Sequence, residues 1–271
     1  MKQQKMLRLV ESGLLLALAT VLSMVKVLDL PYGGSITTFS ALPILLVSYR
    51  HGTSWGLLTA CAHALIQLLL GANTLSYATS PAAAVAIVVL DYLLAFTVLG
   101  LGGIFRRRTN SQSAALVLGA LLTGGLRYIL HVIAGCTVWA GLSIPTEAAL
   151  VYSIAYNATY MVPEVAVTAL GAWYLSRAVN LQETTLSRAP RRQKESRPAA
   201  VAGLLGGAAL LAAAVWDVVE IFRPLQDPET GDFVIQNLSL VNWYLIGIVT
   251  AVGVLLWLIC TCVRKYLNKK N

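Results

Sequence analysis

Long runs of apolar residues dominate this chain and alternate with short polar stretches. A membrane-spanning helix needs about 20 predominantly apolar residues, and eight stretches approach or exceed that length. They are residues 10–28, 36–50, 54–71, 82–104, 114–138, 148–176, 199–222 and 241–263. The second stretch is the shortest and contains Thr37, Thr38 and Ser40. Because a bilayer has no water to satisfy peptide groups, each stretch is predicted to be helical, which gives an all-α polytopic membrane protein.

The composition and the placement of charges agree with this pattern. Only 12% of the 271 residues are charged, about half the share in a soluble domain. Seventeen of the 20 Lys and Arg residues lie in segments that eight spans would place on one side, and the loops on the other side contain only Arg223. The positive-inside rule therefore predicts a multi-pass membrane protein with both termini in the cytoplasm. The net charge of +8 thus reflects topology and does not indicate nucleic-acid binding.

A polar, basic and proline-containing stretch near residue 180 marks the main change in composition. It separates a six-span domain, residues 1–176, from a two-span C-terminal extension, residues 199–271, so that 177–198 is predicted to be a cytoplasmic linker. The first block carries several ionisable side chains at membrane depth, whereas the extension has none near the middle of its spans. The role of the extension stays open between a dispensable appendage and an accessory element.

Polar residues within the first block gather in three spans. An ionisable side chain in a bilayer is expensive unless it is paired, so each is a candidate for function. They are Asp91 and Tyr92 in the fourth span, Arg127, His131, Gly135 and Trp139 in the fifth, and Tyr152, Tyr156, Asn157, Tyr160 and Glu164 in the sixth. The four residues of the fifth span are four apart and share one face. The structural alternatives are an ion pair such as Asp91 with Arg127, and an interfacial position for Trp139.

These residues suit a pocket for a flat organic cation. Aromatic faces attract a cation through their quadrupole, and a carboxylate neutralises it or accepts hydrogen bonds from its amino groups. Gly135 is predicted to leave room for a ring to lie against the helix backbone. Gly33 and Gly34, in the loop after the first span, permit a tight turn or a close approach of backbone.

Four segments carry a resemblance to a known family: PYGGSITTFSALPILLVSYRHG, LDYLLAF, LRYILHVIAG and YSIAYNATYMVP. In this order and spacing they resemble the ThiT (YuaJ) family, the thiamine-binding S components of energy-coupling factor (ECF) vitamin transporters, over residues 8 to 180. The resemblance implies a six-helix S-component bundle that binds thiamine from outside. It also implies a transmembrane coupling protein and two cytoplasmic ATPases as partners, with ATP used only by those partners and no bound cofactor.

The resemblance also implies roles for individual residues. It places the binding carboxylate at Asp91, and the other substrate contacts at Gly34, Tyr77, Tyr92, Arg127, His131, Gly135, Trp139, Tyr152 and Asn157. Some family members have a tryptophan where this chain has Gly34, so the part of that ring falls to Tyr32, to another aromatic residue, or is absent. Gly13 and Ala17 lie on the face of the first helix that would dock the coupling protein; packing inside the bundle is the alternative.

Two other functions are considered. An S component for a different vitamin or for a thiamine precursor would share most of these features. An intramembrane enzyme is the alternative of a different class, but the chain has no HExxH motif. It also lacks a Walker A motif, so the chain is not predicted to power transport through a P-loop of its own.

Overall fold

The computed structural model describes residues 2–30, 33–141, 146–183, 186–188, 196–225 and 235–269. Within these ranges the side chains are described except at 2, 139–141, 146–148, 218, 222, 235, 236, 238 and 269. The chain divides into two compact units, Met1–Ala189 and Pro190–Asn271. We call them unit 1 and unit 2 and describe each by itself.

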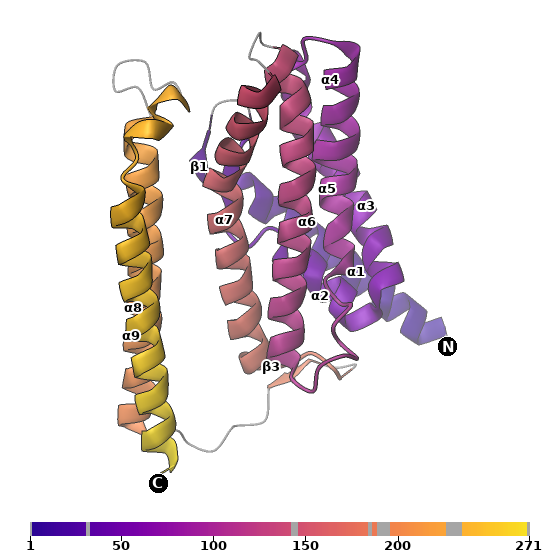
Figure 1. The fold of residues 1–271 in the computed structure, drawn as a ribbon. Helices are drawn as coiled ribbons and strands as arrows, with labels where there is room; N and C mark the ends of the chain where they lie inside the picture. Colours follow the sequence, from indigo (N-terminus) through magenta and orange to yellow (C-terminus); the bar gives the residue numbers. More distant parts are fainter. Residues whose placement is uncertain are drawn as a thin grey trace. The chain divides into compact units, whose positions relative to one another are not determined.

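Unit 1 is a bundle of helical segments with a short β-hairpin (Figure 1). Its helices are α1 (Lys2–Met24), α2 (Leu42–His51), α3 (Thr53–Leu70), a continuous rod made of α4 (Pro81–Ala86), η3 (Ile87–Leu94), α5 (Ala95–Thr97) and η4 (Val98–Leu101), then α6 (Gln112–Gly141) and α7 (Thr146–Ala178). Strands β1 (Lys26–Asp29) and β2 (Ser35–Thr37) pair antiparallel between α1 and α2. The short helix η2 (Ala72–Tyr77) follows α3, and β3 (Val179–Asn180) pairs with β4 (Ser187–Arg188) after α7.

Within the described residues, six helices are long and apolar enough to cross a membrane. They are Gln3–Met24, Thr53–Leu70, Pro81–Leu101 and Gln112–Val138 in unit 1, and Arg197–Leu225 and Trp243–Asn268 in unit 2. Helix α7 has 33 residues and is therefore long enough as well, although more polar. The chain is thus an all-helical, multi-pass membrane protein apart from its two short hairpins.

The prediction of a full span at residues 36–50 was wrong. Residues 35–37 belong to strand β2, and helix α2 has only 10 residues, Leu42–His51. Ten residues of α-helix reach about 15 Å, half of the hydrocarbon core. Every residue from Pro43 to Tyr49 is buried, so α2 is an apolar helix enclosed by protein rather than one that faces lipid. An apolar run of this length does not distinguish the two cases.

Close backbone contacts hold α2, α3 and the rod together. Gly52, with φ +91°, is the single residue between α2 and α3, a conformation that glycine adopts without strain. A Cβ atom on Gly56 of α3 would lie 2.7 Å from the carbonyl oxygen of Gly100 in η4. The two segments therefore approach backbone to backbone, which brings the rod and its polar residues into the centre of the unit.

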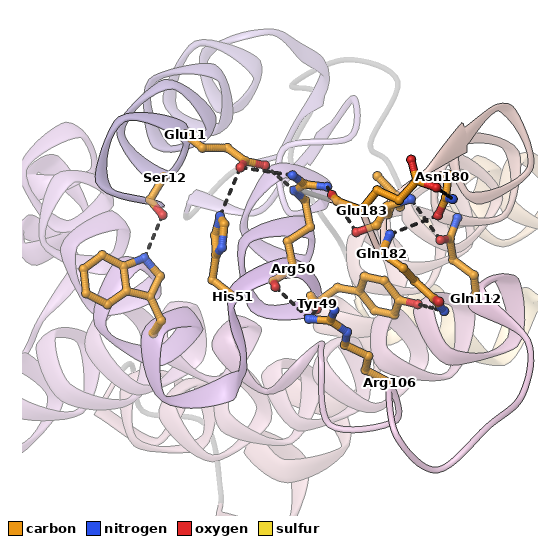
Figure 2. Close-up of polar contacts among 12 residues, drawn as sticks. Glu11, Ser12, Tyr49, Arg50, His51, Arg106, Gln112, Asn180, Gln182 and Glu183 are labelled. Carbon is orange, nitrogen blue, oxygen red and sulfur yellow. Dashed lines mark hydrogen bonds and ion pairs between the residues drawn. The ribbon is translucent and has the colours of Figure 1, made fainter. Parts of the chain in front are cut away.

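A polar cluster closes the end of unit 1 where α7 finishes (Figure 2). We call it the Arg50 cluster, and its residues are Glu11, Ser12, Tyr49, Arg50, His51, Trp55, Arg106, Gln112 and residues 180–183. The guanidinium of Arg50 donates from Nε and Nη2 to the carboxylate of Glu11 and from Nη1 to the carbonyl oxygens of Leu181 and Glu183. Arg50 thus links α1, α2 and the segment after α7.

Further contacts in the Arg50 cluster strengthen these links. Gln112 donates to the carbonyl oxygens of Ser176 and Val179 at 2.8 Å and accepts from the amide of Leu181 at 3.0 Å. The Arg106 side chain lies over the ring of Tyr49 and donates to the Tyr49 carbonyl at 2.9 Å. Side chains of the cluster therefore supply hydrogen-bond donors to backbone carbonyl groups near the ends of α2 and α7.

Unit 2 is an antiparallel pair of helices, α8 (Arg197–Leu225) and α9 (Trp243–Lys269), with the short helix η5 (Ile235–Leu240) between them. Small residues let the two helices approach: a Cβ on Gly206 would lie 2.7 Å from Cβ of Cys260, and one on Gly253 2.6 Å from Cβ of Ala213. Most large apolar side chains of α9 are exposed. This is the distribution expected of helices whose outer faces contact lipid.

Candidate functional site

A cavity of about 680 Å³ lies inside unit 1, between the hairpin, η2, the rod, α6 and α7. Eight of the ten substrate-binding residues proposed from the sequence line it: Gly34, Tyr77, Asp91, Tyr92, Arg127, His131, Gly135 and Asn157. Tyr152 lies behind this lining and stacks on Tyr156, which lines the cavity. The side chain of Trp139 lies outside the described residues. The volume is in the range of cavities that hold small organic ligands.

The acidic wall of the cavity comes from a π-helical segment. Asp91 and Tyr92 belong to η3, in which the amide of Ala95 donates to the carbonyl of Leu90, five residues earlier. One extra residue per turn shifts the side chains relative to a regular α-helix, and such segments are frequent at functional sites. The hydrophobic pattern of the rod contains no signal for this irregularity, so the sequence alone did not predict it.

Asp91 pairs with His131. Oδ1 of Asp91 lies 2.7 Å from Nδ1 of His131, which places a carboxylate of η3 against an imidazole of α6. Nδ1 donates to an ionised carboxylate, and in the neutral imidazole Nε2 then keeps its lone pair. Among the described residues, Nε2 of His131 has no hydrogen-bond partner, although it is buried. An amino group of a ligand can donate to it.

Arg127 pairs with Glu164 rather than with Asp91, the partner given as an example of the structural alternative. Nη1 of Arg127 lies 3.0 Å from Oε1 of Glu164, and both side chains are 6% exposed. The guanidinium also lies 4.6 Å from the ring centroid of Phe96. Within the described part of the chain, its Nε has no hydrogen-bond partner. Sequence alone does not choose between two carboxylates on different helices, because the choice depends on the register of the rod and α7 against α6.

Helix α7 contributes a connected set of polar side chains to the cavity. Nδ2 of Asn157 donates to the carbonyl of Ser153 at 2.8 Å, and its Oδ1 accepts from the hydroxyl of Tyr160 at 2.5 Å. Tyr156 accepts from the amide of Gly34 at 3.0 Å. Tyr156, Asn157 and Tyr160 are all buried. The orientation of these groups is therefore fixed before any ligand arrives.

The spacing of four along α6 correctly placed three residues on one wall, because Arg127, His131 and Gly135 all line the cavity. The predicted gap at Gly135, however, is already occupied. A Cβ there would lie 2.2 Å from Oγ of Ser153, so Gly135 lets α6 and α7 pack closely, and the hydroxyl of Ser153 fills the space intended for a ligand ring. The occupant of this space comes from α7, and the sequence pattern of α6 contains no information about it.

Several lining residues were not proposed from the sequence. Glu164, noted only as a carboxylate at membrane depth, lines the cavity, and so does Phe96, which lies five residues after Asp91. At the rim, Lys26 donates to Asp29 at 3.0 Å in an exposed pair. These two rim residues lie on β1. The apolar pattern assigned Lys26 to the end of the first span and Asp29 to the loop that follows it. Tyr32, proposed as a substitute for a loop tryptophan, lies outside the described residues.

The two small residues proposed for partner binding face outward on α1. Gly13 and Ala17 are exposed, and a Cβ on Gly13 would meet nothing within 4 Å. Ala19, the third small residue of that stretch, is instead fully buried in the core with Ile44 and Leu45. Internal packing therefore does not explain Gly13.

Comparison with known proteins places the chain in a family. Residues 9–182 match the family described as Thiamine transporter protein (Thia_YuaJ). The thiamine transporter ThiT of Bacillus subtilis (strain 168) is 34% identical over 182 residues, which cover 63% of this chain and 91% of that protein. A solved structure of ThiT from Listeria monocytogenes is 22% identical, covers 64% of this chain and 94% of that chain, and has a TM-score of 0.52, which shows the shared fold. The match ends near the boundary of unit 1, and it is a match to transporters rather than to enzymes. The chain belongs to the Thia_YuaJ family of thiamine transporter proteins.

Proposed function

We propose that the chain is the thiamine-binding S component of an ECF-type vitamin uptake transporter. The observation that carries this proposal is the cavity itself: a partly buried Asp91–His131 pair and several phenol rings surround a space of about 680 Å³. This cavity lies within the part of the chain that matches the thiamine transporter family. Unit 2 adds two helices to this core.

The chemistry of thiamine fits the groups in the cavity. Thiamine joins an aminopyrimidine ring to a permanently cationic thiazolium ring. The carboxylate of Asp91 offers a counter-charge to the cation, and Nε2 of His131 is an acceptor for the exocyclic amino group. Arg127 and Glu164 neutralise each other at 3.0 Å, so the carboxylate of Asp91 acts on the ligand with little interference from them. Binding should therefore be tight without ATP.

The distribution of charge supports an outward-facing cavity. The basic segments, including Arg50 and Arg106–Arg108, lie at the end of unit 1 that the Arg50 cluster closes. The positive-inside rule assigns that end to the cytoplasm, together with both termini. The hairpin and η2 then lie at the outer surface of the bacterial cell membrane, where the cavity receives thiamine from outside.

Transport requires partners, because the chain has no P-loop motif of its own. The partners proposed are the transmembrane coupling protein and two cytoplasmic ATPases of an ECF transporter. The exposed Gly13 and Ala17 on α1 form a small-xxx-small pair on which another helix can pack closely. Gly13→Leu should stop thiamine uptake by cells and leave thiamine binding unchanged. Loss of binding in that variant would instead point to a role inside the bundle.

Calorimetry on the purified protein in detergent tests the proposal most directly. Thiamine should bind with no ATP present, and riboflavin and biotin should not bind. A thiamine precursor that contains only the pyrimidine half serves as a third ligand. Tighter binding of the precursor than of thiamine, or binding of riboflavin or biotin alone, would contradict the proposed substrate. Formation of a product from thiamine by the purified protein would favour the enzyme alternative.

A further inference from the structure

Gly34 lies where the hairpin loop meets helix α7. Its amide donates to the hydroxyl of Tyr156 at 3.0 Å, and its carbonyl accepts from the amide of Leu30 at 2.7 Å. A Cβ atom on Gly34 would lie 2.7 Å from the hydroxyl oxygen of Tyr156 and 2.8 Å from Cδ1 of Tyr160. The space of a side chain at position 34 is therefore already filled by two phenol rings.

Both rings are held firmly in that space. Tyr156 stacks on Tyr152, with ring centroids 6.2 Å apart, and meets Tyr160 edge to face at 5.8 Å. The hydroxyl of Tyr160 donates to Asn157, and its ring contacts His131 edge to face at 6.1 Å. All these rings are buried, so neither phenol can swing aside cheaply to admit a side chain at position 34.

Tyr156 and Tyr160 line the same cavity as Asp91. We propose that the rings of Tyr156 and Tyr160 form the aromatic wall for the cationic ring of the ligand, an inference that rests on the proposed function. Residue 34 is then glycine because these two rings occupy the space of its side chain. The wall comes from α7 rather than from the loop. The hydrogen bond from Gly34 to Tyr156 fixes the loop against it.

This arrangement answers the question raised by the absence of a tryptophan at position 34. A loop aromatic and the two tyrosines would fill one volume from opposite sides, so the chain has room for only one of these solutions. A wall on a helix is also more rigid than a ring on a loop.

Calorimetry on the full-length protein tests the wall with two probes: thiamine, and an analogue in which a neutral benzene ring replaces the thiazolium. Tyr156→Leu and Tyr160→Leu should each weaken thiamine binding about thirtyfold or more, because a desolvated cation loses an aromatic face. The same variants should weaken binding of the neutral analogue much less. Tyr156→Phe, which keeps the ring and loses the hydroxyl that accepts from Gly34, should cost about twofold to tenfold. Tyr174→Leu, on an exposed part of α7, is the matched control and should bind both probes as the native protein does.

A second set of variants tests the shared volume. Gly34→Trp alone should lose binding, since its Cβ already overlaps the phenols. In a Tyr156→Ala, Tyr160→Ala background, Gly34→Trp should bind thiamine more tightly than the double alanine variant does, because the indole takes the vacated place. Melting temperatures identify variants that do not fold. If the triple variant does not fold, the comparison of Tyr156→Phe with Tyr156→Leu on the two probes still tests the aromatic wall.

The outcomes separate the two proposals. Native protein that fails to bind thiamine contradicts the proposed function. Native protein that binds thiamine, with leucine variants that are unaffected or that lose both probes equally, contradicts only the tyrosine wall. An indole at position 34 that gives no gain over the double alanine variant contradicts the shared volume.

Discussion

Unit 1 contains two clusters of buried charge that differ in what surrounds them. The cavity cluster consists of Asp91, Arg127, His131 and Glu164, and the Arg50 cluster closes the other end of the unit. Helix α6 contributes to both, through His131 and Gln112. These two residues are 19 positions apart, which corresponds to about 28 Å of helix. In the Arg50 cluster the guanidinium is bound on three nitrogens by protein groups. In the cavity cluster, Nε2 of His131 and Nε of Arg127 are buried without a partner among the described residues.

The difference separates stabilising polar groups from binding ones. A buried polar group without a partner costs free energy, so it persists where another molecule can supply the partner. The Arg50 cluster joins α1, α2 and the segment after α7, and all three nitrogens of its guanidinium have partners. Nε2 of His51 in this cluster is also buried without a hydrogen bond among the described residues, but it lies 3.2 Å from the carboxylate of Glu11. The two clusters therefore differ in the partners that the protein supplies to the guanidinium, and burial and charge alone do not separate them.

The largest effect on folding is expected from Arg50→Ala. Removing one member of a buried ion pair costs about 3–5 kcal/mol, and this arginine also supports two backbone carbonyls. The melting temperature in detergent should fall strongly, while the folded fraction binds thiamine with an unchanged dissociation constant. Arg50→Lys should recover part of the loss. A variant that melts normally but binds thiamine weakly would reverse the roles assigned to the two clusters.

Asp91→Asn should show the opposite behaviour. It removes the counter-charge of the cationic ligand and should weaken binding by about 2–5 kcal/mol. The amide can still accept from His131, so the melting temperature of the ligand-free protein should change little. The matched control is Asp29→Asn at the rim, where an exposed pair with Lys26 is worth about 1 kcal/mol at most. Calorimetry and thermal unfolding on both variants give the comparison; unchanged affinity in folded Asp91→Asn removes Asp91 from the site.

Glu164→Gln should affect both binding and stability, because it leaves the positive charge of Arg127 unpaired beside the cavity. A loss on the order of 1–3 kcal/mol is expected in each. Arg127→Gln in the same chain should restore part of both losses, since the unpaired charge is then gone. The measurement is a double-mutant cycle on thiamine affinity and melting temperature. Strictly additive losses would show that the two residues act independently of each other.

Removal of unit 2 should have a small effect on affinity. Both clusters lie in unit 1, and a chain that ends at Ala189 keeps the carbonyls of Leu181 and Glu183 that bind Arg50. Its thiamine affinity should stay within about threefold of the native value, which is less than 1 kcal/mol. A folded, truncated protein that no longer binds would show that the site extends into α8 or α9.

The smallest effect concerns pH and His51, which lies 3.2 Å from Glu11 in the Arg50 cluster. Burial lowers the pKa of His51 below 6.5, against the attraction of Glu11 and with the repulsion of Arg50. The folded protein therefore binds fewer protons than the unfolded chain, and stability present above the unfolded pKa is lost as the pH falls through the folded pKa. Between about pH 7.5 and about pH 5.5 the native melting temperature should fall slightly more than that of His51→Gln. Parallel curves would mean that His51 does not titrate in this range.

The apolar pattern predicted most helices of unit 1 to within a few residues but was wrong at residues 36–50. Apolarity reports that a segment avoids water, and it does not report whether lipid or protein surrounds it. Helix α2 is enclosed by protein, so it needs no span length. Helix α7 also shows that the pattern does not identify the surroundings of a segment, because its 33 residues include Pro163 and Glu164.

The sequence by itself determined the membrane environment and identified most of the proposed residues that the structure places around the cavity. Hydropathy, charge placement and helical spacing are local properties, and three residues on α6 were placed on one wall by spacing alone. Only the tertiary structure decided the partners: His131 for Asp91, Glu164 for Arg127, Ser153 for the gap at Gly135, and Tyr156 with Tyr160 for the space at Gly34. Each pairing depends on the register and rotation of one helix against another, and that geometry is set by packing across the whole bundle rather than by any single segment.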